Sequence, residues 1–141
     1  MSRTAIELDW ERLTNQAAAA TAYAYVPYSH YPVGAAAIAA DGRLLMGANV
    51  ENASYGLTLC AECSLVSQLI MTGGGRLTHF VCVDGNGSVM APCGRCRQLL
   101  WEHGGPHLRI LTPTGESTLG HLLPEPWGLD DLKRGPAWGE N

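Results

Sequence analysis

The chain has 141 residues, of which 46% are hydrophobic and 16% charged, a composition typical of one globular domain with a buried core. We therefore predict a single domain over 1–141. The formal net charge is −4 and Lys133 is the single lysine, so a nucleic-acid partner is not expected, because such proteins present basic residues to phosphates. The longest apolar stretch, 17–26, is too short to span a bilayer, so no membrane association is expected.

The first half of the chain predicts a helix, a β-hairpin and a second helix. Asp9 is placed to cap the first helix and Pro27 to stop it. Asp41-Gly42 between two runs of small or apolar residues predicts a tight hairpin turn. The predicted ranges are 9–26 for the first helix, 33–40 and 44–50 for the strands, and about 60 to the triple glycine at 73–75 for the second helix.

The second half predicts strands that alternate with one more helix. A buried strand is expected where Phe80, Val81 and Val83 cluster, and a helix between Cys93 and the glycine pair that follows it. The predicted ranges are 77–83, 108–112 and 117–119 for strands, 93–104 for the helix and 122–133 for an ordered extension. This order of elements predicts an α/β domain layered around a mixed sheet.

The start of the chain, 1–13, predicts a cytoplasmic protein. It contains Glu7, Asp9 and Glu11 and lacks the basic start and long apolar run of an export signal. In a reducing compartment, cysteines serve as metal ligands or core residues more often than as disulfides. We apply this interpretation to the five cysteines, which stand at positions 60, 63, 82, 93 and 96.

Two segments, Cys60-Ala61-Glu62 and Pro92-Cys93-Gly94-Arg95-Cys96, predict a metal site. Cys93 and Cys96 are three residues apart and so share one face of a helix. A structural zinc site closes with four protein ligands, whereas a catalytic site keeps one position for water. Three cysteines with an adjacent glutamate that is not a ligand therefore predict a catalytic zinc site, a layout typical of zinc-dependent nucleobase deaminases.

The predicted metal site assigns roles to two charged side chains. Glu62 is expected to take a proton from zinc-bound water and pass it to the substrate, then to bring another to the leaving amine. Three thiolates and Zn²⁺ sum to −1, a charge that opposes ionisation of the water. Arg97, directly after Cys96, is the predicted donor to a ligand sulfur that offsets this charge, and Arg95 is a weaker candidate.

Other interpretations of the cysteines stay open. Cys60 and Cys63 also form a C-x-x-C pair, so a structural site of four cysteines is the main alternative. A thioredoxin-like redox role for Cys93 and Cys96 would leave Cys60 without a purpose. Cys82 lies within an apolar strand and is interpreted as a core residue.

Further segments occur in a fixed order along nearly the whole chain. They are Tyr25-Val26-Pro27-Tyr28-Ser29, Tyr31-Pro32-Val33-Gly34-Ala35, Asn49-Val50-Glu51-Asn52-Ala53-Ser54-Tyr55 and Pro92-Cys93-Gly94-Arg95-Cys96-Arg97-Gln98. With Cys60-Ala61-Glu62 they resemble the small homotetrameric cytidine deaminases. The resemblance implies a three-layer α/β/α fold with a five-stranded mixed sheet and one zinc per subunit on Cys60, Cys93 and Cys96. It also implies deamination of cytidine and deoxycytidine to the uridine forms, with release of ammonia, in pyrimidine salvage.

The resemblance also implies substrate contacts. Asn49 and Glu51 are expected to bind the ribose hydroxyls, since an amide and a carboxylate together donate and accept. Tyr31 stands where relatives often stack a Phe on the pyrimidine, and the backbone around Ala61 is expected to meet the base edge. Tyr55 and Trp127 resemble residues that reach a neighbouring subunit's pocket, and the resemblance implies a homotetramer.

The sequence departs from the family pattern at one position, and two functions other than cytidine deamination stay open. Cys63 stands where many members of the family carry an Arg beside the thiolates, so the charge correction depends more on Arg97. An aminonucleoside-antibiotic deaminase of the blasticidin S type shares the run 92–98, although Asn49 and Glu51 favour an ordinary ribose. A non-enzymatic zinc module would show no open coordination position.

Overall fold

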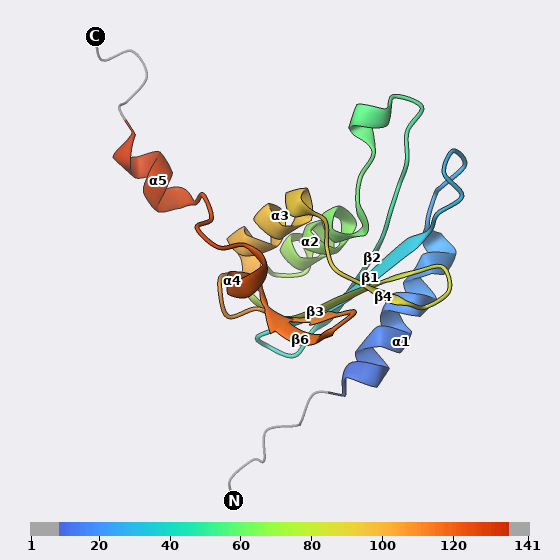
Figure 1. Cartoon of the computed structure of the whole chain (residues 1–141), viewed down its shortest axis with the longest axis horizontal. Helices are drawn as coiled ribbons and strands as arrows, with labels where there is room; N and C mark the ends of the chain where they lie inside the picture. The colour runs from blue at the N-terminus through green and yellow to red at the C-terminus, as the bar shows by residue number, and fades with distance from the viewer. Residues whose placement is uncertain (1–8, 136–141) are drawn as a thin grey trace, which may run out of the picture.

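The computed structural model describes residues 9–135, which form three layers with a mixed sheet in the middle (Figure 1). The strand order is β2-β1-β3-β5-β6, and β4 pairs with β3. All neighbouring strands are antiparallel except β3 and β5, which are parallel. The strands are β1 (Val33–Ala39), β2 (Leu44–Ala48), β3 (Leu77–Asp84), β4 (Val89–Met90), β5 (Arg109–Thr112) and β6 (Gly115–Thr118).

The helices cover both faces of this sheet. One helix, α1, packs on β1 and β3, whereas α2 packs on the opposite face against β2 and β1 and contacts α3 (Figure 1). None of the described helices is long and apolar enough to cross a membrane. The helices are α1 (Trp10–Ala20), α2 (Ala61–Met71), α3 (Gly94–Gly104), α4 (Leu119–Leu122) and α5 (Leu129–Arg134), with short 3-10 turns η1 (Thr21–Tyr23) and η2 (Tyr55–Leu57).

The first helix follows from its cap and its small residues. The Asp9 carboxylate accepts a hydrogen bond from the Arg12 N–H at 3.2 Å and so satisfies one of the unpaired donors of the first turn. The inward side of α1 is narrow and apolar, and its residues pack against the alternate side chains of the sheet. The buried cluster on this face is Leu13, Ala17, Ala36, Val81 and Val83.

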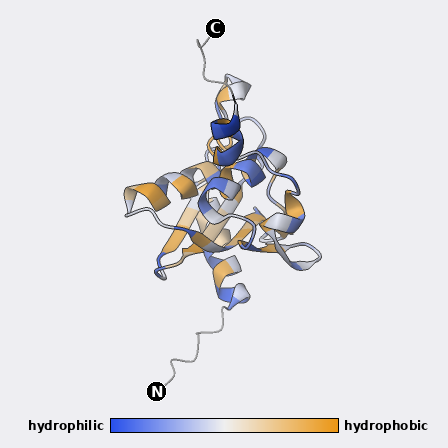
Figure 2. Ribbon diagram, turned by 90° about the vertical axis from the view of Figure 1, so that its left-hand side faces the viewer, coloured by the Kyte–Doolittle hydropathy of each residue, from blue (hydrophilic) through white to orange (hydrophobic). Residues whose placement is uncertain are grey.

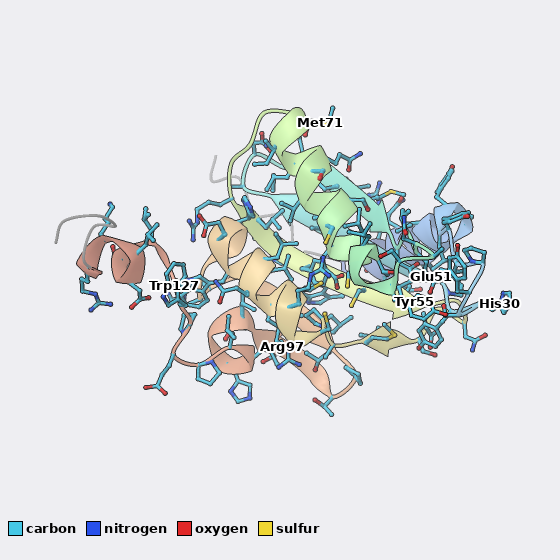
Figure 3. All side chains as sticks on the ribbon, turned by 90° about the horizontal axis from the view of Figure 1, so that it is seen from above. His30, Glu51, Tyr55, Met71, Arg97 and Trp127 are labelled. Atoms are coloured by element: carbon cyan, nitrogen blue, oxygen red, sulfur yellow. The ribbon has the colours of Figure 1, made fainter. Side chains whose placement is uncertain are left out.

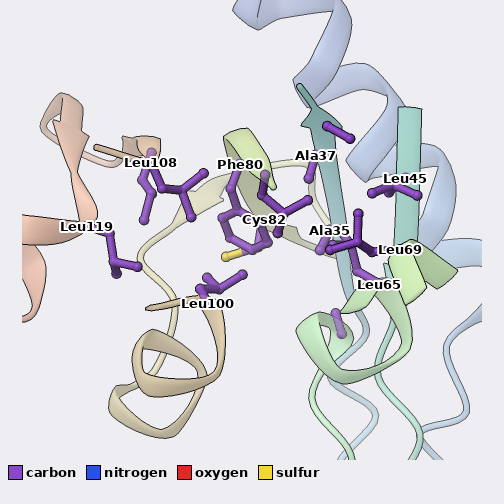
Figure 4. Packing of buried hydrophobic residues seen from close by; sticks show 14 residues of the cluster. Ala35, Ala37, Leu45, Leu65, Leu69, Phe80, Cys82, Leu100, Leu108 and Leu119 are labelled. Atoms are coloured by element: carbon purple, nitrogen blue, oxygen red, sulfur yellow. The ribbon is translucent and has the colours of Figure 1, made fainter. Parts of the chain in front are cut away.

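A larger core lies between the other face of the sheet and α2 and α3 (Figure 4). Phe80, at the centre of β3, is fully buried and contributes roughly 1.5–3 kcal/mol by leaving water. Helix residues Leu65, Leu69 and Leu100 belong to the same cluster and lie on the side of the sheet that α2 and α3 cover (Figure 4). The hydrophobic colouring of the central strands in Figure 2 shows the same interior position. This packing fixes how α2 and α3 lie relative to each other.

The predicted fold class is confirmed, whereas the number of strands and several boundaries differ. The sheet has six strands instead of five, because the two-residue β4 pairs with β3 beyond the turn at 84–88 and is too short to leave a pattern. The first helix ends at Ala20, where η1 replaces the predicted continuation to Val26. The last strand, β6, covers Gly115–Thr118 instead of the predicted 117–119, and Leu119 is the first residue of α4. The ends of the predicted domain, 1–8 and 136–141, lie outside the described residues.

Candidate active site

The three cysteines predicted as zinc ligands meet at the point where two helices begin. Their sulfur atoms all lie within 4.8 Å of one another. Cys60 is the N-cap of α2 and Cys93 the N-cap of α3, and Cys96 lies in the first turn of α3. Both helices direct unpaired N–H groups and the positive ends of their dipoles toward the sulfurs. Two helix starts thus form an environment that favours anionic ligands.

The sulfur cluster fits a zinc ion. Tetrahedral Zn²⁺ with bonds of about 2.3 Å holds its thiolates about 3.8 Å apart, so the observed spacing needs only a small contraction. Within residues 9–135 this group contains three cysteines and does not include Cys63, which argues against the four-cysteine structural site. Cys82 is buried in the core, and its thiol donates to the Met90 carbonyl oxygen at 3.3 Å, which confirms its interpretation as a core residue.

The three thiols influence one another's pKa values. Burial raises the pKa of Cys60 and of Cys96, and the Glu62 charge raises the pKa of Cys96 further. Burial also acts on Cys93, but hydrogen bonds from the backbone and side chain of Cys96 oppose it and the net shift lowers the Cys93 pKa. The Cys93 thiol therefore ionises more readily than the thiols of Cys60 and Cys96, whose thiolate forms a bound cation would stabilise.

Glu62 lies in the first turn of α2, beside the ligand cluster. Its side chain is buried, with the residue only 3% exposed, which is rare for a carboxylate. The Glu62 carboxylate is near both Cys96 and Cys82, and its charge adds to burial in raising the pKa of each thiol. A buried carboxylate next to soft metal ligands is well placed to move protons.

The sugar-binding candidates lie at the end of β2 and tie together neighbouring segments. Asn49 accepts from the Val33 N–H through Oδ1 at 2.9 Å and donates through Nδ2 to the Tyr31 carbonyl oxygen at 3.0 Å. Glu51 Oε1 accepts from the N–H groups of Tyr28 and Ser29, each at 3.1 Å. Hydrogen bonds from Ser29 and then Tyr28 lower the pKa of Glu51, so it is ionised at neutral pH.

Glu51 borders an open pocket of about 370 Å³. Its lining residues are Tyr28, Ser29, Glu51, Asn52, Tyr55 and Thr58. The rings of Tyr28 and Tyr55 meet edge to face, with centroids 6.1 Å apart, and Tyr55 lies close to Glu51 in Figure 3. Tyr55 therefore lines the pocket of its own chain. No role was expected from the sequence for Ser29, Asn52 or Thr58, although Ser29 and Asn52 lie within the segments that carry the resemblance.

The remaining substrate candidates occupy separate places. Tyr31 is half-exposed and its hydroxyl donates to Met90 Sδ at 3.3 Å, which ties the ring to β4. Ala61 is fully buried as the first residue of α2. Trp127 is 58% exposed and lies at the opposite end of the molecule from Glu51 and Tyr55 (Figure 3). The structure therefore does not bring Trp127 to this chain's own pocket.

The two arginines of the second motif have different surroundings. Arg97 donates to the carbonyl oxygens of Pro92 at 2.9 Å and Leu122 at 3.0 Å. These two bonds connect the backbone just before Cys93 to the end of α4. Arg95 lies beside a sulfur, with its Nη2 atom 3.7 Å from Cys63 Sγ. The arginine expected to be the weaker candidate is thus the one with a hydrogen bond to a thiol.

Comparison with known proteins places this geometry in a family. The sequence matches the family described as the cytidine and deoxycytidylate deaminase zinc-binding region over residues 9–112. It is 59% identical over 128 residues to a cytidine deaminase of Mycobacterium tuberculosis, covering 91% of this chain and 96% of the relative.

Solved structures agree with that match. A cytidine deaminase structure from Mycobacterium leprae is similar with a TM-score of 0.83 at 60% identity, and covers 84% of this chain and 100% of that chain. One from Mycobacterium tuberculosis has a TM-score of 0.85 at 58% identity, with 87% and 100% covered. The segment 9–112 includes the three clustered cysteines and Glu62.

Proposed function

This chain belongs to the cytidine and deoxycytidylate deaminase family, and from that premise we propose that it deaminates cytidine and deoxycytidine hydrolytically. The products are uridine or deoxyuridine and ammonia. The observation that carries the proposal is the buried Glu62 carboxylate beside three sulfurs that lie within 4.8 Å of one another. The family is a zinc-binding one, and Cys60, Cys93 and Cys96 are the residues that would hold one zinc ion.

The chemistry divides between the metal and Glu62. Zinc, when bound, supplies a Lewis acid that lowers the pKa of a water toward neutrality. Glu62 accepts a proton from the water that adds to C4 of the pyrimidine and donates it to N3. It then takes the proton of the new C4 hydroxyl and delivers it to the C4 amine, so that the C4=O bond forms as the C4–N bond breaks and ammonia leaves.

The sugar and base are held by residues at the end of β2. Glu51, ionised and fixed by two backbone N–H groups, can accept hydrogen bonds from ribose hydroxyls. Asn49 is held by Val33 and Tyr31 and is proposed to add a second contact to the sugar. Tyr31 is proposed to stack on the pyrimidine ring, and the backbone of Ala61 to meet the base edge.

A substrate comparison tests this function. Zinc-loaded protein is mixed separately with cytidine, deoxycytidine and blasticidin S, and ammonia release and the ultraviolet change are followed. We expect turnover of both nucleosides. Turnover of blasticidin S alone would move the function to antibiotic resistance. No turnover of any of the three by folded, zinc-loaded protein would contradict the proposed function.

We also propose that the chain self-associates as a homotetramer and that Trp127 acts across a subunit boundary. Large apolar side chains are exposed on α2 and the loop before it, where Leu57 is 64% and Met71 86% exposed. The C-terminal segment extends away from the layered body and exposes Trp127 and Leu132 as well (Figures 1 and 2). Exposed apolar surface of this kind typically marks an interaction site.

A complementation experiment tests the Trp127 role. Glu62→Gln and Trp127→Ala variants are each assayed alone, then unfolded together, refolded and assayed as a mixture. If Trp127 completes a neighbour's site, mixed assemblies regain activity above the sum of the separate variants. Sedimentation of the wild type measures the oligomeric state, and a monomer with full activity would contradict this part of the proposal.

We further propose that the protein works in the cytoplasm, in pyrimidine salvage. All five cysteines are unpaired thiols in the structure, and the three clustered ones must stay reduced to bind a metal. A reducing compartment meets this requirement. Cell fractionation with an antibody against the chain tests the location, and loss of growth on cytidine as the sole pyrimidine source in a deletion strain tests the pathway.

A further inference from the structure

The outer edge of β2 is covered by the same segment that carries the catalytic residues. β2 is at the end of the strand order, so within residues 9–135 the N–H and C=O groups along its outer side face no other strand of the sheet. They are paired instead at three alternate residues. The three pairs are the Met46 N–H with Gln68 Oε1 (2.8 Å), the Ala48 N–H with Ser64 Oγ (3.0 Å), and two backbone bonds between Val50 and Leu59 (2.9 and 2.8 Å).

We call these pairs the edge ladder. They form because the spacing of every fourth residue in a helix is close to that of every second residue in a strand. Residues four apart in a helix rise by about 6.0 Å, and residues two apart in a strand by about 6.8 Å. Ser64 and Gln68 can therefore meet Ala48 and Met46 in succession. Gly47, between the two strand residues, has no side chain to keep α2 away. A Cβ there would lie 2.7 Å from Ser64 Oγ.

Ser64 makes the most extensive contact in the ladder. Besides accepting from the Ala48 N–H, its hydroxyl lies 3.1 Å from the Ala48 carbonyl oxygen and 3.1 Å from that of Ala61. The hydroxyl thus joins the end of β2 to the first residue of α2. Gln68 makes one bond, from an exposed side chain one turn further along.

The reacting groups lie between two rungs of this ladder. Cys60 and Glu62 are in the short segment that is pinned at Leu59 on one side and at Ser64 on the other. Asn49 and Glu51 flank Val50, the strand partner of Leu59. The Leu59 and Ser64 rungs, and not the outer Gln68 rung, therefore enclose the segment that joins Glu62 to the residues proposed to hold the sugar.

We propose that Ser64 is a positioning residue for the deamination, whose hydroxyl holds Glu62 in register with Asn49 and Glu51. This inference rests on the proposed function. A displacement of about 1 Å between a catalytic group and a bound substrate can lower the rate about 100-fold. Loss of the hydroxyl is therefore expected to lower kcat more than it changes KM, because the sugar contacts on β2 stay in place.

A pair of variants isolates the hydroxyl. Ser64→Thr keeps it and Ser64→Val replaces it with a methyl group of similar size, so any steric cost is common to both. We expect Ser64→Thr to retain most activity and Ser64→Val to lose about 10- to 100-fold in kcat, with zinc content unchanged. Gln68→Leu removes the outer rung and is the control, with kcat expected close to wild type.

Different results would contradict the positioning role of Ser64 and the proposed deaminase function. Equal kcat in folded Ser64→Thr and Ser64→Val, or a loss in Ser64→Val that appears only in melting temperature, would overturn the positioning role. If crowding prevents both from folding, Ser64→Ala replaces them, and normal kcat in that variant overturns the inference. A zinc-loaded wild type that turns over no nucleoside would overturn the proposed function, and the inference with it.

Discussion

Gly47 lies directly beneath the first turn of the catalytic helix, and a Cβ built on it would stand 2.1 Å from the carbonyl oxygen of Ala61. No side chain fits in that space, because the neighbouring atom is backbone and cannot rotate away. Because Gly47 has no side chain, the first turn of α2 can pack directly on β2, which places Cys60 and Glu62 at the sulfur cluster.

Gly47→Ala is expected to displace the start of α2. The overpacking should lower the free energy of unfolding by about 1–3 kcal/mol and reduce zinc retention, because Cys60 moves with the helix. Gly56→Ala is the matched control, since a Cβ at Gly56 meets nothing within 4 Å. Denaturant unfolding and metal analysis of both variants provide the measurement, and equal stability of the two would contradict the close-packing account.

Arg43 closes the other end of α2. Its guanidinium pairs with Asp41 at 2.8 Å, donates to Thr72 Oγ1 at 2.9 Å, and also donates to the carbonyl oxygen of Gly74. Gly74 has a φ of 73°, in the left-handed region that glycine adopts without strain. The triple glycine at 73–75 therefore bends around an arginine that caps the helix.

Removing this cap should destabilise the fold without abolishing the chemistry. Arg43→Ala loses charge-assisted hydrogen bonds to the last turn of α2, and we expect a cost of about 1–3 kcal/mol. Arg134→Ala is the control, because the Arg134 side chain is 74% exposed and its contacts within residues 9–135 are to Asp131 and to the backbone of its own short helix. Thermal melts compare the two, and an unchanged midpoint for Arg43→Ala would refute the capping role.

His79 belongs to a polar cluster on the face of the sheet opposite the active site. Its Nδ1 atom lies 2.8 Å from Thr78 Oγ1, and its Nε2 atom lies 3.2 Å from Arg109 Nη1. The Trp10 ring of α1 packs edge-on against it with centroids 5.7 Å apart, and Glu116 of β6 pairs with Arg109. Burial and then the Arg109 charge lower the pKa of His79, against the opposing effect of Glu116.

This shift predicts how stability depends on pH. Because the His79 pKa is lower in the folded chain than its ordinary value of 6.5, the unfolded chain binds the proton more readily. The free energy of unfolding should therefore fall as pH drops below about 6.5 toward the lowered pKa. His79→Gln should reduce that fall, whereas the surface variant His107→Gln should not. A wild-type-like pH profile in His79→Gln would show that the cluster has no part in it.

Replacing Arg97 and replacing Arg95 are expected to have different effects on turnover and zinc affinity. Arg97→Ala is expected to fold yet lose activity steeply, because the bonds that hold the Pro92 carbonyl just before Cys93 disappear. Arg95→Ala removes the guanidinium nearest to the Cys63 sulfur. Turnover and zinc affinity, measured by competition with a chelator, are compared for both. Near-normal turnover in Arg97→Ala with a loss in Arg95→Ala would show that Arg95, and not Arg97, offsets the negative charge of the thiolates.

The sequence predicts those parts of the site that depend on local spacing. Cys93 and Cys96 share a helical turn, and each of the two motifs, 60–62 and 92–96, is contiguous in the sequence, so the ligand set and Glu62 could be named from them. The layered fold followed from the order of helices and strands.

Features that depend on tertiary contacts could not be predicted in this way. Nothing near Ser64 in the sequence indicates that it will pair with Ala48, because that contact exists only after α2 packs beside the strand. The direction of a long side chain is equally non-local, which is why Arg97 was expected at a sulfur and is found on two carbonyl groups. The two-residue β4 was missed because it is too short to leave a pattern, and the first helix was expected to continue past Ala20 because no glycine or proline precedes Pro27.

We infer that Glu62 transfers the protons of the reaction at a zinc site built from Cys60, Cys93 and Cys96. The most direct measurement is ammonia release from cytidine by zinc-loaded Glu62→Gln, with zinc content determined on the same sample and exposed Glu102→Gln as the control. We predict that Glu62→Gln keeps its zinc and its affinity for the nucleoside but loses turnover by at least about 100-fold, while Glu102→Gln matches the wild type. Wild-type turnover by zinc-loaded Glu62→Gln would contradict the account.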